Sequence, residues 1–72
     1  MNYYKIDVPG RNGYSFMVCS TDYLDEYEVF GKCIENGYFD NDSDAKYAII
    51  DDLVTPMDIE NFEKNDCIFN LD

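Results

Sequence analysis

The chain has 72 residues and carries 16 acidic against 5 basic side chains, which gives a formal net charge of -11. Such a charge makes direct binding to DNA, RNA or an acidic membrane unfavourable, because all three are polyanions. The sequence contains no histidine, and it therefore lacks the commonest general base and the commonest metal ligand. Hydrophobic residues make up 46% of the chain, which is enough for one small folded domain and argues against disorder.

The cysteines and the N-terminus indicate where the protein works. Cys19, Cys33 and Cys67 are odd in number and form no C-x-x-C pair, whereas a disulfide framework needs an even count and a zinc site needs clustered ligands. We expect three reduced thiols, mostly packed as small hydrophobic side chains. No apolar stretch typical of a signal peptide opens the chain, and no run reaches the roughly 18 residues of a membrane span. The sequence therefore predicts a cytoplasmic protein.

Two alternating runs predict an N-terminal β-hairpin. In residues 3–8 and 14–19 every second side chain is apolar, which is the period of a half-buried strand. The five residues between the runs, from Pro9 to Gly13, are rich in turn formers. Two such runs joined by a short turn are typical of a hairpin.

A long amphipathic helix is predicted to follow the hairpin. Residues 20–22 offer N-caps, and Gly37 suits the left-handed position that ends a helix. Close approach of the helix to the sheet would account for Gly31 in its interior. Phe30 and Ile34 are expected to anchor the helix to the sheet. Tyr23, Tyr27 and Tyr47 are expected to pack in the core. The predicted apolar stripe recurs at i, i+4, i+7 and i+11 and consists of Tyr23, Tyr27, Phe30 and Ile34.

The C-terminal half predicts a second helix between two strands. Residues 46–54 are ambiguous, because their β-branched and aromatic content favours a strand whereas a cap at Asp44 and one apolar face favour a helix; we expect the strand. Thr55 followed by a proline and an acidic N3 residue predicts a short helix from Pro56 to about Lys64, with Ile59 and Phe62 buried.

A last strand is expected at residues 67–71. The resulting order β-β-α-β-α-β predicts a single α+β domain over residues 1–72. It has a small antiparallel or mixed sheet, covered by one long and one short helix on one face.

The sequence argues against calcium binding and against enzymatic catalysis. Asp40–Asp44 is similar to the start of an EF-hand calcium loop, but Ala45 stands where that loop needs glycine and Asp51 where it needs glutamate. We therefore expect a solvated acidic loop and no bound metal. No serine or cysteine has a histidine to activate it, and Gly10–Gly13 lacks the spacing of a phosphate-binding loop. The sequence predicts neither an enzyme nor a cofactor.

The distribution of charge is the remaining functional signal. Residues 1–36 carry a net charge of -3 and residues 37–72 a net charge of -8. Carboxylates spaced at about 3.3 Å per residue can roughly copy the phosphates of one DNA strand. Such a surface predicts a partner with a basic groove built for nucleic acid. The candidate contact residues are Asp40, Asp42, Asp44, Asp51, Asp52, Asp58, Glu60 and Glu63.

In its size, acidity and lack of histidine, and in its acidic stretches Asp40–Asp44 and Asp51–Glu63, the chain resembles phage-encoded anti-CRISPR proteins and other DNA-mimic inhibitors. The resemblance covers the whole chain in composition and rests on no specific motif. It implies an inhibitor that binds a CRISPR effector in the host cytoplasm and blocks access to DNA. The alternative is an acidic antitoxin or immunity-type protein that neutralises a basic partner without mimicry. The sequence leaves the choice between monomer and dimer open.

Overall fold

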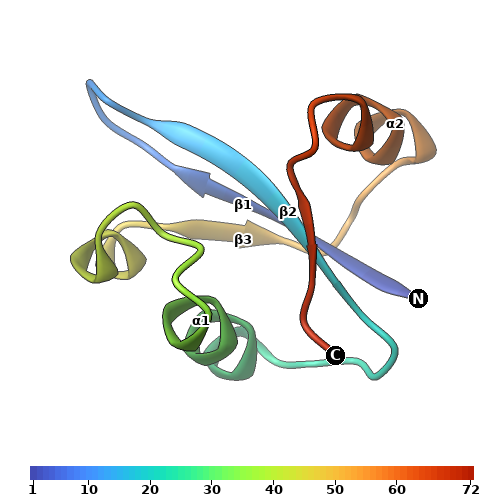
Figure 1. Cartoon of the computed structure of the whole chain (residues 1–72), viewed down its shortest axis with the longest axis horizontal. Helices are drawn as coiled ribbons and strands as arrows, with labels where there is room; N and C mark the ends of the chain where they lie inside the picture. Colours follow the sequence, from blue (N-terminus) through green and yellow to red (C-terminus); the bar gives the residue numbers. More distant parts are fainter.

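The computed structural model describes residues 1–72, which have an α+β fold (Figure 1). The order of the strands and α-helices, β-β-α-β-α-β, confirms the predicted fold class. A short 3-10 helix, η1, precedes the third strand. The elements are β1 (Asn2–Val8), β2 (Tyr14–Ser20), α1 (Glu26–Glu35), η1 (Asp42–Lys46), β3 (Ile49–Asp51), α2 (Pro56–Lys64) and β4 (Ile68–Asn70).

The four strands form one mixed sheet in the order β3-β1-β2-β4. The predicted hairpin is confirmed, since β1 pairs antiparallel with β2 from Asn2 opposite Ser20 to Val8 opposite Tyr14. β3 lies antiparallel to β1, and β4 lies parallel to β2. The hairpin turn requires glycine at position 13, because a Cβ there would lie 2.6 Å from the carbonyl oxygen of Val8.

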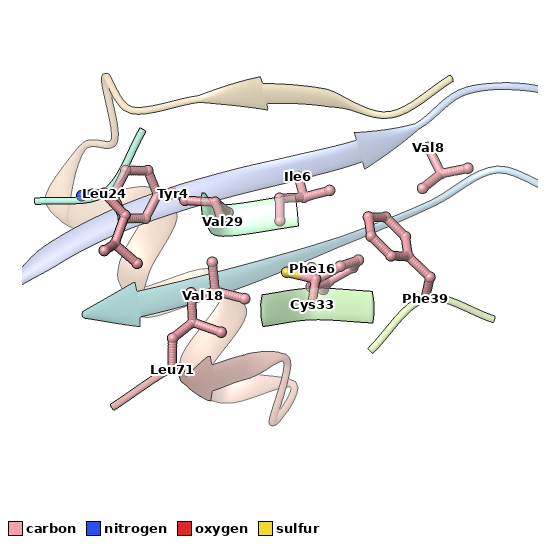
Figure 2. Packing of buried hydrophobic residues seen from close by; sticks show 10 residues of the cluster. All are labelled: Tyr4, Ile6, Val8, Phe16, Val18, Leu24, Val29, Cys33, Phe39 and Leu71. Carbon is pink, nitrogen blue, oxygen red and sulfur yellow. The ribbon is translucent and has the colours of Figure 1, made fainter. Parts of the chain in front are cut away.

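The main core lies between one face of the hairpin and α1. Alternate residues of β1 and β2 point to this face, as the period of a strand requires. Figure 2 shows these side chains meeting Val29 and Cys33 of α1, both of which are completely buried. The buried cluster comprises Tyr4, Ile6, Val8, Phe16, Val18, Leu24, Val29, Cys33, Phe39 and Leu71.

The buried face of α1 differs from the predicted stripe. Tyr27 is 88% exposed and Ile34 40% exposed, so Ile34 does not anchor the helix; Phe30 is half-buried against the core. The inward residues are instead Val29 and Cys33, one turn apart. Both side chains are smaller than tyrosine, and both are completely buried between the helix and the strands. The expected core positions of Tyr23 and Tyr47 are also wrong, because each is 68% exposed.

α1 is also shorter than expected, with ten residues. Its N-cap is Asp25, whose carboxylate accepts a hydrogen bond from the backbone N–H of Glu28 at 2.8 Å, while the Glu28 side chain accepts from the N–H of Asp25. This capping box starts the helix at Glu26 and leaves Tyr23 in the preceding segment. At the other end, Gly37 has the expected left-handed conformation, with φ of 71°.

The second helix lies on the opposite face of the sheet. Met17 points away from the neighbouring Phe16 and Val18, yet it is completely buried, and α2 contacts β2 and β4. The expectation that both helices cover one face is therefore wrong, because the Met17 side of the hairpin also needs a cover. The bounds and the Thr55 cap of α2 are as predicted, although its inner residues, Ile59 and Phe62, are only half-buried.

The ambiguous segment 46–54 is a strand only at its centre. β3 spans three residues, Ile49–Asp51, and forms an edge of the sheet. The alternative expectation was a helix capped at Asp44. The structure has only a short 3-10 helix there, η1, which ends at Lys46. Of the three free thiols, Cys19 and Cys33 are buried as expected and Cys67 is half-buried.

Replacing Gly31 by alanine is expected to stabilise the protein. A Cβ at this position meets no atom within 4 Å, and the residue lies inside α1, so the expected close approach to the sheet does not account for the glycine. Alanine is favoured over glycine by about 1 kcal/mol in a helix interior. The melting temperature of Gly31→Ala should rise. An unchanged or lower value would contradict this account of the site.

Candidate acidic binding surface

Every acidic side chain reaches the surface. Thirteen of the sixteen are exposed, and the other three, Asp7, Asp44 and Asp58, are half-buried. None of them is taken out of solvent in the core. The charge of -11 is therefore available to a partner over the whole molecule.

The first group of candidate residues, Asp40, Asp42 and Asp44, lies beside the hairpin turn. The hydroxyl of Tyr14 donates to Oδ2 of Asp44 at 2.6 Å and accepts from the backbone N–H of Asp40 at 2.8 Å. Asp40 and Asp44 also line a shallow cavity of about 330 Å³ together with Arg11. The hydrogen bond from Tyr14 to Asp44 thus holds η1 against the hairpin, and Arg11 is the one basic residue that lines the same cavity.

Titration with base should identify Tyr14. Its pKa is raised from 10.0 to about 12, first by burial and then by the hydrogen bond to the Asp44 carboxylate. The folded state holds this proton more tightly than the unfolded state. The stabilisation is therefore complete below pH 10 and is lost as the pH rises through about 12.

The measurement is the ultraviolet absorbance of tyrosinate as the pH is raised. Among the 7 tyrosines, the pKa of Tyr23 is also raised, by its hydrogen bond to Asp52, so Tyr14→Phe should lose one tyrosine from the late step of the parent rather than the whole step. Tyr3→Phe is the control that should leave the late step in place. A late step of undiminished amplitude in Tyr14→Phe would contradict the contact with Asp44.

The second group, Asp51 and Asp52, lies at the end of the edge strand β3. Oδ1 of Asp51 accepts from the backbone N–H of Leu53 at 2.9 Å, and Asp51 stands opposite Lys5 in the β1–β3 register. Oδ2 of Asp52 accepts from the hydroxyl of Tyr23 at 3.2 Å. This hydrogen bond is the main reason why the pKa of Tyr23 is raised.

The third group belongs to α2. Asp58 completes the capping box with Thr55, and hydrogen bonds from Thr55 are the main cause of its lowered pKa, to which the charge of Lys5 adds. The side chains of Glu60 and Glu63 are exposed on the same helix and make no hydrogen bond within the chain. The carboxylates of Glu60 and Glu63 can therefore bind a partner without breaking a hydrogen bond inside the protein.

The eight candidate residues do not form one patch. η1 and α2 lie toward opposite ends of the longest axis, which measures 28 Å (Figure 1). They also lie on opposite sides of the sheet, because η1 contacts α1 on one face and α2 covers the other. Three of the eight, Asp44, Asp51 and Asp58, have structural roles. The residues left for a partner are Asp40, Asp42, Asp52, Glu60 and Glu63.

Sequence reasoning missed a further set of surface residues near Asp52. Tyr23 is 68% exposed and Leu53 is 84% exposed, and Glu26 lines the same cavity as Tyr23 and Asp52. The sequence did contain a signal for this arrangement, the D-x-x-E capping-box pattern from Asp25 to Glu28. It places the start of the helix after Tyr23 and so takes this ring out of the helical stripe.

No group of three or more cysteine, aspartate or glutamate side chains is arranged to hold a metal ion. No helix combines the length and apolar character that crossing a membrane requires. Comparison with protein-family models, with curated proteins and with solved structures gave no significant match to this chain.

Proposed function

We propose that the protein is a cytoplasmic inhibitor that binds a nucleic-acid-binding protein, such as a CRISPR effector, and blocks its access to DNA. The observation that carries the proposal is the exposure of nearly all acidic side chains of a chain with a net charge of -11. A basic groove that normally holds phosphates attracts such a surface over long range and speeds association. The compositional resemblance to DNA-mimic inhibitors supports the same class of partner.

The dimensions of the molecule suit a groove made for a short duplex. Its longest extent is 28 Å. Phosphates of one DNA strand follow one another at about 3.4 Å along the axis, so this length corresponds to about eight base pairs. Acidic groups occur at both ends and in the middle of this length, at η1, at the end of β3 and on α2. Because η1 and α2 lie on opposite sides of the sheet, a basic groove that contacts both sides of the molecule suits the charge distribution better than a flat contact on one face.

A second candidate is an immunity-type protein that neutralises a basic partner away from its DNA groove. The exposed apolar side chains favour it, because phosphate mimicry makes no use of them. Tyr27 and Leu53 are 88% and 84% exposed, and Ile49 on the edge strand is 59% exposed. Tyrosine and aliphatic side chains of this kind are typical anchors of ordinary protein interfaces.

Elution with DNA separates the two functions. The immobilised protein is exposed to host lysate, and bound proteins are eluted either with short duplex DNA or with salt of equal ionic strength. The inhibitor proposal predicts that DNA releases the principal partner and that salt of equal ionic strength does not. The purified partner should then bind this protein and duplex DNA in a mutually exclusive way in a gel-shift assay.

The opposite result identifies the alternative. A partner that forms a ternary complex with this protein and DNA contradicts mimicry and supports an immunity-type interaction. Capture of no basic or nucleic-acid-binding protein at all contradicts both proposals.

A further inference from the structure

A small cavity lies where β1, β3 and the segment before α1 meet. Its volume is about 200 Å³. Buried Tyr4 and Leu24 belong to its floor, and Glu26 and Asp52 bring carboxylates to it from two separate parts of the chain. The lining residues are Tyr4, Tyr23, Leu24, Glu26, Ile50 and Asp52.

This cavity has no cationic side chain of its own. Its lining includes two carboxylates and no lysine or arginine. Two other acidic groups differ in this respect. Asp40 and Asp44 line a cavity together with Arg11, and the charge of Lys5 lowers the pKa of Asp58. The two carboxylates of the lining therefore have no cationic side chain in the cavity to pair with; Met1, the N-terminal residue, lines the adjoining cavity that shares Tyr4, Tyr23 and Asp52.

The aromatic wall is held in place by contacts on two sides. The ring of Tyr23 packs 6.2 Å from that of Tyr4 in a tilted arrangement, and its hydroxyl donates to Asp52. Tyr4 is in turn fixed, because its hydroxyl accepts from the backbone N–H of Leu24 at 2.8 Å. An exposed aromatic ring next to two carboxylates attracts a planar cation by stacking and by charge together.

We propose that this cavity binds the guanidinium group of an arginine presented by the basic partner. The inference rests on the proposed function, since it assigns a partner side chain to one part of the acidic surface. Arginine fits better than lysine, because its planar fork can donate to the carboxylates of Glu26 and Asp52 while its flat face lies on Tyr23. A second copy of this chain is a poor occupant, because two molecules each carrying a charge of -11 repel each other.

The test uses a single guanidinium group as the probe. The isotope-labelled protein is titrated with N-acetyl-arginine amide and followed by NMR of its backbone amides. N-acetyl-citrulline amide, which has nearly the same shape without the charge, is the control ligand. Saturable shifts should occur at Tyr23, Leu24, Glu26 and Asp52 with the arginine compound and not with the citrulline compound.

Matched variants establish that the cavity is responsible. Asp52→Asn and Glu26→Gln should each weaken binding of the arginine compound by about two- to fivefold, as expected for a solvent-accessible ion pair. Glu35→Gln removes the same charge from the C-terminal end of α1, outside the candidate groups, and should leave the affinity unchanged. Shifts spread equally over all acidic side chains, equal shifts with the citrulline compound, or equal weakening by all three substitutions would overturn the proposal.

The outcome is independent of the test of function. Arginine binding in the cavity together with a partner that DNA does not release refutes the inhibitor function and leaves the cavity as a guanidinium site. Release of the partner by DNA without arginine binding in the cavity refutes this inference and leaves the function standing. Dimerisation that Asp52→Asn abolishes would show that a second copy occupies the site, and it would also refute the inference.

Discussion

Phe16→Ala is expected to lower the free energy of unfolding by about 3–5 kcal/mol, which is the usual cost of removing a buried phenylalanine. Phe16 is 4% exposed in the centre of β2. Its ring meets Phe39 edge-on at 5.5 Å and Phe69 at 6.0 Å. One side chain thus joins the hairpin to the segment after α1 and to β4. A domain of this size has only about 3–5 kcal/mol of stability to lose, so most of the variant should be unfolded.

Urea denaturation followed by circular dichroism measures the effect. Phe16→Leu keeps most of the volume and should cost less than about 1.5 kcal/mol, which keeps the site measurable if the alanine variant does not fold. Tyr27→Ala is the control, because this larger side chain is 88% exposed on α1. It should change stability by no more than about 0.5 kcal/mol. Similar losses for Phe16→Ala and Tyr27→Ala would show that the assigned core is wrong.

Neutralising one acidic residue in each group is expected to abolish most partner binding without unfolding the protein. The variant combines Asp42→Asn, Asp52→Asn and Glu63→Gln. Loss of charge pairs that become desolvated in a complex should weaken binding by at least about 30-fold. Stability should stay equal or rise, because the substitutions reduce repulsion within a chain of net charge -11. Binding to the partner identified by DNA elution and the melting temperature are the two measurements.

A second triple variant controls for overall charge. Asp22→Asn, Glu35→Gln and Asp66→Asn also remove three exposed carboxylates, all outside the candidate groups. Both variants carry the same net charge, so general attraction to a basic partner falls equally. Only the first should lose binding steeply. Equal losses would mean that net charge alone attracts the partner, and no loss in the first variant would remove the candidate residues from the interface.

The helix caps and the hairpin turn of this protein could be predicted from short stretches of sequence. Thr55-Pro56 and the acid at Asp58 determine the start of α2, because capping needs only a few neighbouring residues. Alternation in β1 and β2 likewise determined the hairpin and its face toward α1, but it did not predict the burial of Met17 and Cys19 on the other face. The face of α1 was not determined in this way. Tyr27 and Val29 are both apolar enough to point inward, and only the packing of the whole chain showed that Val29 and Cys33 face the core.

For the candidate acidic surface, too, some properties follow from the sequence and others only from the tertiary structure. The sequence by itself determined the charge, its excess in the second half and the absence of histidine, and these properties define the class of partner that we propose. Only the tertiary structure showed that η1 and α2 carry their acids on opposite faces, since α2 must cover Met17. Only the pairing of β3 with β1 places Asp52 beside Tyr23, 29 residues away in the chain. Charge and caps follow from composition and near neighbours, whereas a cavity between distant segments depends on how the whole chain packs.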